Sequence, residues 1–237
     1  MAISRMLRRS GVAIVTVVEW LDWRPDTVYQ VGVGQFHQEV DVMAECWPGV
    51  AFFGCEPNPS IVNKTIDYPG QLLSCAVGDH DGTATLWWTR KHKDGGSLYP
   101  FDSNEHTDVE VDLHTLDSLY LDGVQAAGRV LLWLDCEGSE LAVLQGGERF
   151  MEHVDAVNVE MTSQAPWIEG KRIGQAMVDV HRWLIEHGFW RQWVHTQRNR
   201  GQHDAIYVRS EIFQVRCCCS PTEIERWYNT IDKEDEK

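Results

Sequence analysis

Short apolar runs alternate along the chain with stretches in which apolar residues recur at helical spacing. Runs typical of buried strands cover residues 28–33, 50–55, 71–77, 129–134 and 154–159. Helical spacing covers residues 36–46, 139–144 and 173–187, and Gly188 follows the last of these at a position where helices commonly end. This alternation predicts a mostly parallel sheet with helices on both faces.

Four shorter stretches predict additional strands. Residues 83–88 alternate like an added antiparallel strand, and residues 109–113 follow after a polar loop. Residues 189–194 and 205–208 predict a closing hairpin.

We expect three regions along the chain: a helical lead-in over residues 1–25, one α/β domain over residues 26–210, and a helix with an acidic tail over residues 211–237. An apolar run over residues 11–18 follows three arginines, as in a signal peptide. The run is too short for a membrane span, because about 20 apolar residues are needed to cross a bilayer. We therefore expect no stable membrane insertion and a cytoplasmic protein.

Composition and charge narrow the function classes. The chain has 237 residues, of which 43% are hydrophobic and 24% charged, as in soluble globular domains. Its net charge of −15 repels phosphate backbones, so we expect no nucleic-acid partner. Seven cysteines, an odd number, favour reduced thiols, and the run of Cys217, Cys218 and Cys219 has no assigned role.

Candidate chemistry lies at the ends of the predicted strands, because ligands of parallel sheets bind outside the carboxyl ends of the strands. Polar residues or glycines stand at these ends: Gly32, Gly34, Glu56, Asp79, Asp135, Glu137 and Glu160.

The residues at the first two of these strand ends predict a site for a nucleoside. Gly32 and Gly34 allow a backbone to approach a ligand closely, and Glu56 follows the second strand, where an acid can accept both hydroxyls of a ribose. The third glycine of a dinucleotide fingerprint would fall at His37, so that motif is incomplete. An adenosine-containing cofactor is favoured, and an NAD-dependent oxidoreductase is one class of enzyme that fits. Next to Glu56, Asn58 and Pro59 predict an N-cap and the first turn of a helix.

Three acids cluster after the strand at residues 129–134. If the chain stays extended there, Asp135 and Glu137 project to one face, where paired carboxylates can hold a hard cation or act as a base. Glu140 has a simpler interpretation as an acid in the first turn of a helix. His37 and Glu160 are reserve candidates for the base.

Five segments taken together give a more specific indication of the protein family. In chain order they are Val31-Gly-Val-Gly34, Cys55-Glu-Pro-Asn-Pro59, Ala76-Val-Gly-Asp79 with Gly82, Thr115-Leu-Asp117, and Leu134-Asp-Cys-Glu-Gly-Ser-Glu-Leu-Ala-Val-Leu-Gln-Gly-Gly147. Over residues 26–208, this combination resembles the FkbM family of S-adenosyl-L-methionine-dependent methyltransferases.

The resemblance implies a class I methyltransferase fold. This is a Rossmann-like three-layer α/β sandwich, with a mostly parallel seven-stranded sheet and an antiparallel C-terminal strand. It also implies O-methylation, and we expect the acceptor to be a hydroxyl of a sugar, glycan or other small metabolite. A divalent cation that assists the reaction is a further possibility.

The resemblance also implies roles for individual residues. The cofactor-binding candidates are Gln30, Gly32, Gly34, Glu56, Pro57, Asn58, Asp79 and Asp135. The catalytic candidates are Asp135 and Glu137, which match the family's signature, together with His37 as the reserve base named above.

Several positions depart from the pattern of the family. Gln30 stands where an acid is usual, Gln35 and Phe36 stand where small residues are typical, and Trp133 stands where lysine is common. Because of these departures, a non-catalytic binding module of the same fold stays an alternative.

Overall fold

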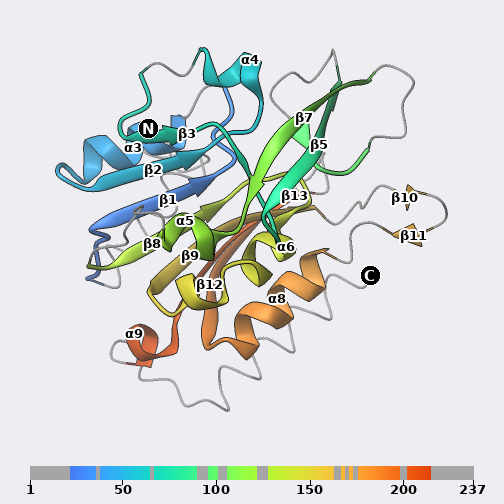
Figure 1. The fold of residues 1–237 in the computed structure, drawn as a ribbon. Helices are drawn as coiled ribbons and strands as arrows, with labels where there is room; N and C mark the ends of the chain where they lie inside the picture. Colours follow the sequence, from blue (N-terminus) through green and yellow to red (C-terminus); the bar gives the residue numbers. More distant parts are fainter. Residues whose placement is uncertain are drawn as a thin grey trace.

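A seven-stranded sheet forms the centre of the computed structural model (Figure 1). The structure describes residues 22–35, 38–64, 67–89, 96–100, 106–121, 128–162, 167–168, 171–172, 176–197 and 202–214. The strands lie in the order β12 (Phe189–Gln197), β13 (Gln202–Arg209), β9 (Val154–Thr162), β8 (Val130–Leu134), β1 (Thr27–Val31), β2 (Ala51–Cys55) and β3 (Gln71–Leu73). All neighbouring pairs are parallel except those of β13, which is antiparallel to both β9 and β12. The predicted α/β sheet with an antiparallel C-terminal strand is therefore confirmed.

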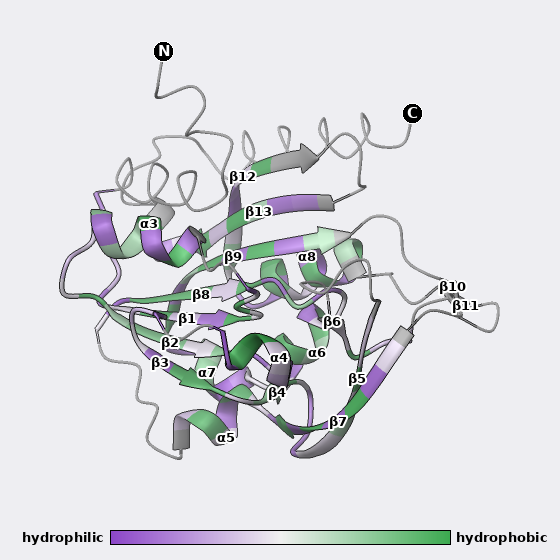
Figure 2. Cartoon of the chain, turned by 90° about the horizontal axis from the view of Figure 1, so that it is seen from above, coloured by the Kyte–Doolittle hydropathy of each residue, from purple (hydrophilic) through white to green (hydrophobic). Residues whose placement is uncertain are grey.

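Helices cover both faces of this sheet (Figure 2). One face packs against α5 (Leu116–Leu121), α6 (Glu140–Gln145), α7 (Glu148–Met151) and α8 (Ala176–Glu186). The other face packs against α3 (Gln38–Cys46) and against Ile212 of α9 (Ser210–Gln214). All five residues of β8 are buried, which explains why this strand is a continuous apolar run in the sequence.

A second, four-stranded sheet stands beside the main one and is called the small sheet below. Its order is β4 (Ala76–Val77), β7 (His106–His114), β5 (Gly82–Thr89) and β6 (Gly96–Ser97). It has a separate apolar cluster that includes Leu86 and Leu113. The prediction of one strand over residues 71–77 was wrong, because β3 pairs with β2 whereas β4 leaves the main sheet and pairs with β7. A third pair of short strands is formed by β10 (Trp167–Ile168) and β11 (Lys171–Arg172).

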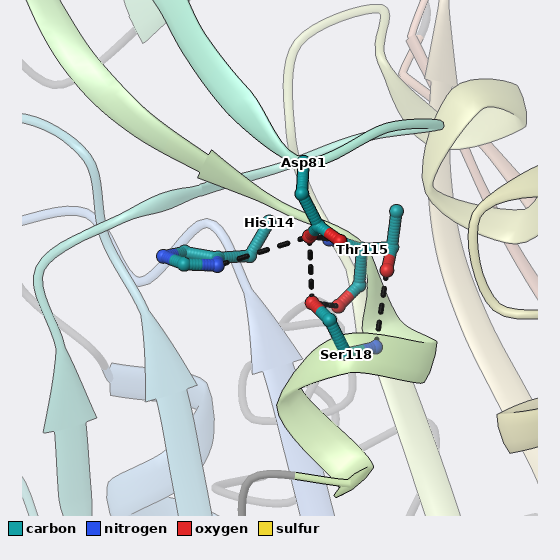
Figure 3. A network of polar contacts seen from close by, with 4 residues as sticks. All are labelled: Asp81, His114, Thr115 and Ser118. Atoms are coloured by element: carbon teal, nitrogen blue, oxygen red, sulfur yellow. Dashed lines mark hydrogen bonds and ion pairs between the residues drawn. The ribbon is translucent and has the colours of Figure 1, made fainter.

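A polar network fixes the small sheet to α5 (Figure 3). The Asp81 carboxylate accepts hydrogen bonds from the Thr115 amide at 2.8 Å and from the Ser118 hydroxyl at 2.7 Å, and His114 Nδ1 lies 3.8 Å away. The Thr115 hydroxyl accepts from the Ser118 amide, so it caps the first turn of α5. Asp117 accepts from the amide of Phe150 at 2.7 Å and thereby caps α7. The Thr115-Leu-Asp117 segment is thus a structural link between three elements.

Other element boundaries differ from prediction in detail. Asn58 caps α4 (Pro59–Val62) as predicted, and its side chain accepts a hydrogen bond from the Ser60 amide. β9 was predicted to stop before Glu160 but continues to Thr162, because Glu160 pairs with Asp204 of β13.

The terminal regions lie mostly outside the described residues. Residues 1–21 and 215–237 are among these, and so the helical lead-in, the acidic tail and the cysteine run stay predictions. Within the described part of the chain, no helix is long and apolar enough to cross a membrane.

Candidate active site

A cavity opens at the carboxyl edge of the main sheet. It has an empty volume of about 670 Å³ including its open mouth, and the loops that follow β1, β2 and β8 form much of its wall. Six of the predicted site residues line it: Gly32, Gly34, Glu56, Pro57, Asp135 and Glu137. Residues that are far apart in sequence therefore meet in one place.

The glycine turn after β1 brings two loops into contact. Gly32 and Gly34 have φ angles of +82° and +65°, in the region that favours glycine. A Cβ atom on Gly32 would lie 1.8 Å from the carbonyl oxygen of Asp135, whereas nothing lies within 4 Å of the Cβ position of Gly34. Gly32 thus allows close packing of the β1 and β8 loops, and Gly34 leaves open space in the cavity wall.

Glu56 is held at the end of β2 by two backbone amides. Its carboxylate accepts from Gly34 N at 2.9 Å and from Asn58 N at 2.8 Å, and the residue is only 5% exposed. An ionised carboxylate has about four acceptor positions. Two amide hydrogen bonds therefore orient the group in the cavity wall, where a carboxylate suits a diol such as that of ribose.

Asp135 ends β8 directly beside the glycine turn. Its amide donates to Val31 O at 2.9 Å, so the ladder between β8 and β1 continues to this residue. Burial raises the pKa of the Asp135 carboxyl well above its usual range, and the charges of Glu160 and Glu137 raise it further. A carboxyl with a raised pKa is a better proton acceptor when it is ionised.

The chain turns after Asp135. Glu137 has a φ of +51°, which is rare for a residue other than glycine. The expectation of an extended segment over residues 135–137 was therefore wrong, although both acids line the cavity. The Ser97 hydroxyl donates to the Glu137 carbonyl at 2.7 Å, so the small sheet holds this turn in place.

Glu140 is the first residue of α6, as its simpler interpretation predicted, but it is turned inward. One carboxylate oxygen accepts from Gly138 N at 3.0 Å, and the residue is 1% exposed. Within the described residues its other oxygen has no hydrogen-bond partner. Burial raises the pKa of this carboxyl.

Three predicted site residues among the described ones do not line the cavity. Gln30 is buried in β1, and Asn58 is buried at the N-terminus of α4. Asp79 is exposed, and its carboxylate lies 2.6 Å from Nδ1 of His80. His37 falls outside the described residues. The roles of these four residues stay predictions.

The unusual Trp133 also lies away from the cavity. It is 2% exposed and belongs to the apolar cluster on the α3 side of the sheet. Its departure from the family pattern therefore affects core packing and not the cavity wall.

Sequence reasoning missed part of the cavity wall. The small sheet contributes Leu86, Gly96 and Leu98. Ser139 also lines the cavity, and its hydroxyl is buried without a hydrogen-bond partner among the described residues. Its place within the Asp-x-Glu-Gly-x-Glu segment was the available signal, whereas nothing local marks the residues of the small sheet.

The cavity fits the cofactor that the resemblance implies. Glu56 presents an oriented carboxylate, Ser139 a hydroxyl that has no hydrogen-bond partner among the described residues, and Gly34 open space beside its backbone. These groups suit the hydroxyls and polar tail of an adenosine-containing ligand. No group of three or more His, Cys, Asp or Glu side chains in the described part of the chain could hold a metal ion.

Three solved structures are similar to the chain at low identity. Magnesium protoporphyrin IX methyltransferase from Synechocystis PCC 6803, with bound SAM, has 12% identity and a TM-score of 0.44, and the match covers 84% of this chain and 79% of that one. The plantazolicin methyltransferase BpumL in complex with SAH has 8% identity, a TM-score of 0.46 and coverages of 84% and 82%. Fibrillarin from Aeropyrum pernix, with natively bound S-adenosyl-L-methionine, has 10% identity, a TM-score of 0.45 and coverages of 78% and 69%. No curated protein matches the chain.

A family model supplies the identification. The model described as "Methyltransferase FkbM domain" matches residues 28–202, a range that includes every residue found to line the cavity. The match supports the methyltransferase interpretation and gives no support to an NAD-dependent oxidoreductase. The chain belongs to the FkbM methyltransferase family and is an S-adenosyl-L-methionine-dependent methyltransferase.

Proposed function

We propose that the enzyme methylates a hydroxyl oxygen of a sugar or other small metabolite, and that Asp135 removes the proton of that hydroxyl. The observation that carries this proposal is the position of Asp135, a carboxyl with a raised pKa in the cavity wall. A hydroxyl is a weak nucleophile until its proton is removed, so a nearby base accelerates the transfer.

The atoms balance in a single displacement. S-adenosyl-L-methionine, when bound, would supply a methyl group already activated on a sulfonium and would leave as a neutral thioether. Asp135 would take the proton of the acceptor hydroxyl on a carboxylate oxygen as the hydroxyl oxygen bonds to the methyl carbon. The main task of the protein is alignment of the acceptor oxygen with that carbon.

The residues around the cavity have different roles in this methyl transfer. Glu56 is suited to accept the ribose hydroxyls, because two backbone amides hold its carboxylate at the end of β2. Glu137 lines the same wall, and the Ser97 hydrogen bond to its carbonyl fixes the turn that also positions Asp135.

The Asp135→Asn variant tests the role of the base. It keeps the shape of the side chain and removes its basicity, so we expect turnover on any accepted substrate to fall by about 100-fold or more. Binding of S-adenosylhomocysteine, measured by calorimetry, should persist. Asp108→Asn, at an exposed position of β7, is the matched control. Unchanged turnover in Asp135→Asn would remove this residue from the mechanism.

A further inference from the structure

A row of carboxyl groups crosses the main sheet beyond the cofactor cavity. Leu134 of β8 pairs with Val159 of β9, so the next residues, Asp135 and Glu160, are neighbours. Glu160 pairs in turn with Asp204 of β13. Three adjacent strands therefore each contribute one acid at the same level, and these three residues are called the acid row below.

The acid row faces the α3 side of the sheet. Side chains two residues apart on a strand share a face. Trp133 and Ile206 lie two residues from Asp135 and Asp204, and both belong to the apolar cluster on the α3 side. Of the acid row, only Asp135 also lines the cofactor cavity. It therefore marks the boundary between the cavity and the row.

Buried amide groups lie directly below the acid row. Asn158 is two residues before Glu160 on the same face, and it is fully buried. Neither its amide nitrogen nor its amide oxygen has a hydrogen-bond partner among the described residues, and the same holds for the amide oxygen of Gln30. A buried polar group without a partner is costly, so the Asn158 amide would gain from a hydrogen bond to a polar ligand group.

Carboxylates act on two members of the acid row, whereas Asp204 pairs with His195 of β12. After burial, the charges of Glu137, Glu140 and Glu39 raise the pKa values of both Asp135 and Glu160, and Asp204 raises that of Glu160 further. Neither Asp135 nor Glu160 forms an ion pair within the described part of the chain. A positive charge placed here relieves this repulsion.

We propose that the acid row, with Asn158 beneath it, binds a protonated amino group of the methyl acceptor. The acceptor is then a hydroxyl compound that also carries an amine, such as an amino sugar or amino alcohol. Neighbouring strands lie about 4.8 Å apart, so Asp204 is about 10 Å from Asp135 across the row. The amine therefore stands about 5–10 Å from the hydroxyl that Asp135 deprotonates.

An ammonium group fits these observations better than a metal ion. The described residues contain no group of three acids, histidines or cysteines that could hold a metal. An ammonium group donates three hydrogen bonds, which suits separate carboxylates and the amide oxygen of Asn158.

Paired probes test this inference, which rests on the proposed function. The full chain is saturated with S-adenosylhomocysteine and titrated calorimetrically with glucosamine and N-acetylglucosamine, then with tyramine and N-acetyltyramine. Each pair differs in the charged amine. We expect the amine to bind about tenfold or more tightly than its acetylated form, because charge-assisted hydrogen bonds are lost on acetylation.

Variants test whether the acid row causes the preference for the amine. Glu160→Gln and Asp204→Asn should each reduce the preference for the amine by about tenfold. Glu110→Gln, at an exposed position of β7, should keep it. Equal binding within both pairs, or no binding of either amine, would overturn the inference, as would Mg²⁺ binding that Glu160→Gln abolishes.

Binding of S-adenosylhomocysteine distinguishes a failure of this inference from a failure of the proposed function. If S-adenosylhomocysteine binds and the amine preference is absent, the acid row has no role in acceptor binding but the proposed O-methylation stands. If S-adenosylhomocysteine does not bind to the wild-type chain, the proposed function itself fails, and this inference fails with it.

Discussion

Gly32 and Asp135 are packed so closely that a Cβ atom on Gly32 would lie 1.8 Å from the carbonyl oxygen of Asp135. The contact joins the first strand of the sheet to the strand that carries the proposed base. Residue 32 must therefore lack a side chain for the two loops to pack, in addition to any role of the glycine turn in ligand binding. The position of Asp135 in the cavity therefore depends on the absence of a side chain more than 100 residues earlier in the chain.

Gly32→Ala should destabilise the protein and displace Asp135. The added methyl group meets backbone atoms that cannot rotate away, and φ is positive, so we expect a loss of about 2–4 kcal/mol in the free energy of unfolding. Denaturant unfolding measures this. Gly49→Ala is the control, because Gly49 has a φ of +88° but nothing within 4 Å of its Cβ position. Equal losses in both variants would show that the contact with Asp135 has no effect of its own.

Glu56→Gln should weaken cofactor binding. The amide keeps the shape of the carboxylate but cannot accept charge-assisted hydrogen bonds from ribose hydroxyls, each of which is worth about 1.5–3 kcal/mol. We expect the Kd for S-adenosylhomocysteine to rise by about 10-fold to 100-fold. Calorimetry gives the value, with Glu110→Gln as the control. An unchanged Kd would place the ribose elsewhere.

Glu160→Gln should change how stability depends on pH. Burial, followed by the charges of Asp204, Glu137, Glu140 and Glu39, raises the pKa of Glu160 from 4.5 to about 8. Between these values the folded state holds a proton that the unfolded chain releases, so this carboxyl reduces stability as pH rises through the window. We expect the variant to gain about 1–3 kcal/mol relative to the wild type at pH 9 compared with pH 5. Thermal unfolding at several pH values measures the difference, and a pH-independent gain would contradict the raised pKa.

Asp117→Ala should reduce stability without affecting the cofactor. The carboxylate of Asp117 caps α7 through the amides of Arg149 and Phe150, and an N-cap is worth about 1 kcal/mol. We expect a loss of this size in the free energy of unfolding and an unchanged Kd for S-adenosylhomocysteine. Asp108→Ala is the control at an exposed position. A strong loss of cofactor affinity would instead link Asp117 to the cavity.

Local patterns predicted the parts of the fold that depend on local chemistry. The run of five apolar residues in β8 marked a strand buried on both faces, and Asn58 with Pro59 marked the start of α4. Glu56 and Asp135 were found because the ends of parallel strands share one edge of a sheet. In each case the signal lies within a few residues of the feature.

The rest depends on pairing that no local pattern records. Ala76 and Val77 continue the apolar run of β3, yet their partners are Leu113 and His114 in another sheet. Glu137 has a positive φ, and its carbonyl accepts a hydrogen bond from Ser97, which is 40 residues away. The pairing of Glu160 with Asp204 likewise requires the register of β9 against β13.

The small sheet lines the cavity with Leu86, Gly96 and Leu98, yet its apolar cluster is separate from the two clusters of the main sheet. The part of the wall that the small sheet forms therefore packs on an apolar cluster of its own. A substitution of Leu86 can reshape that wall without removing a contact from the core of the main sheet or a hydrogen bond from Glu56.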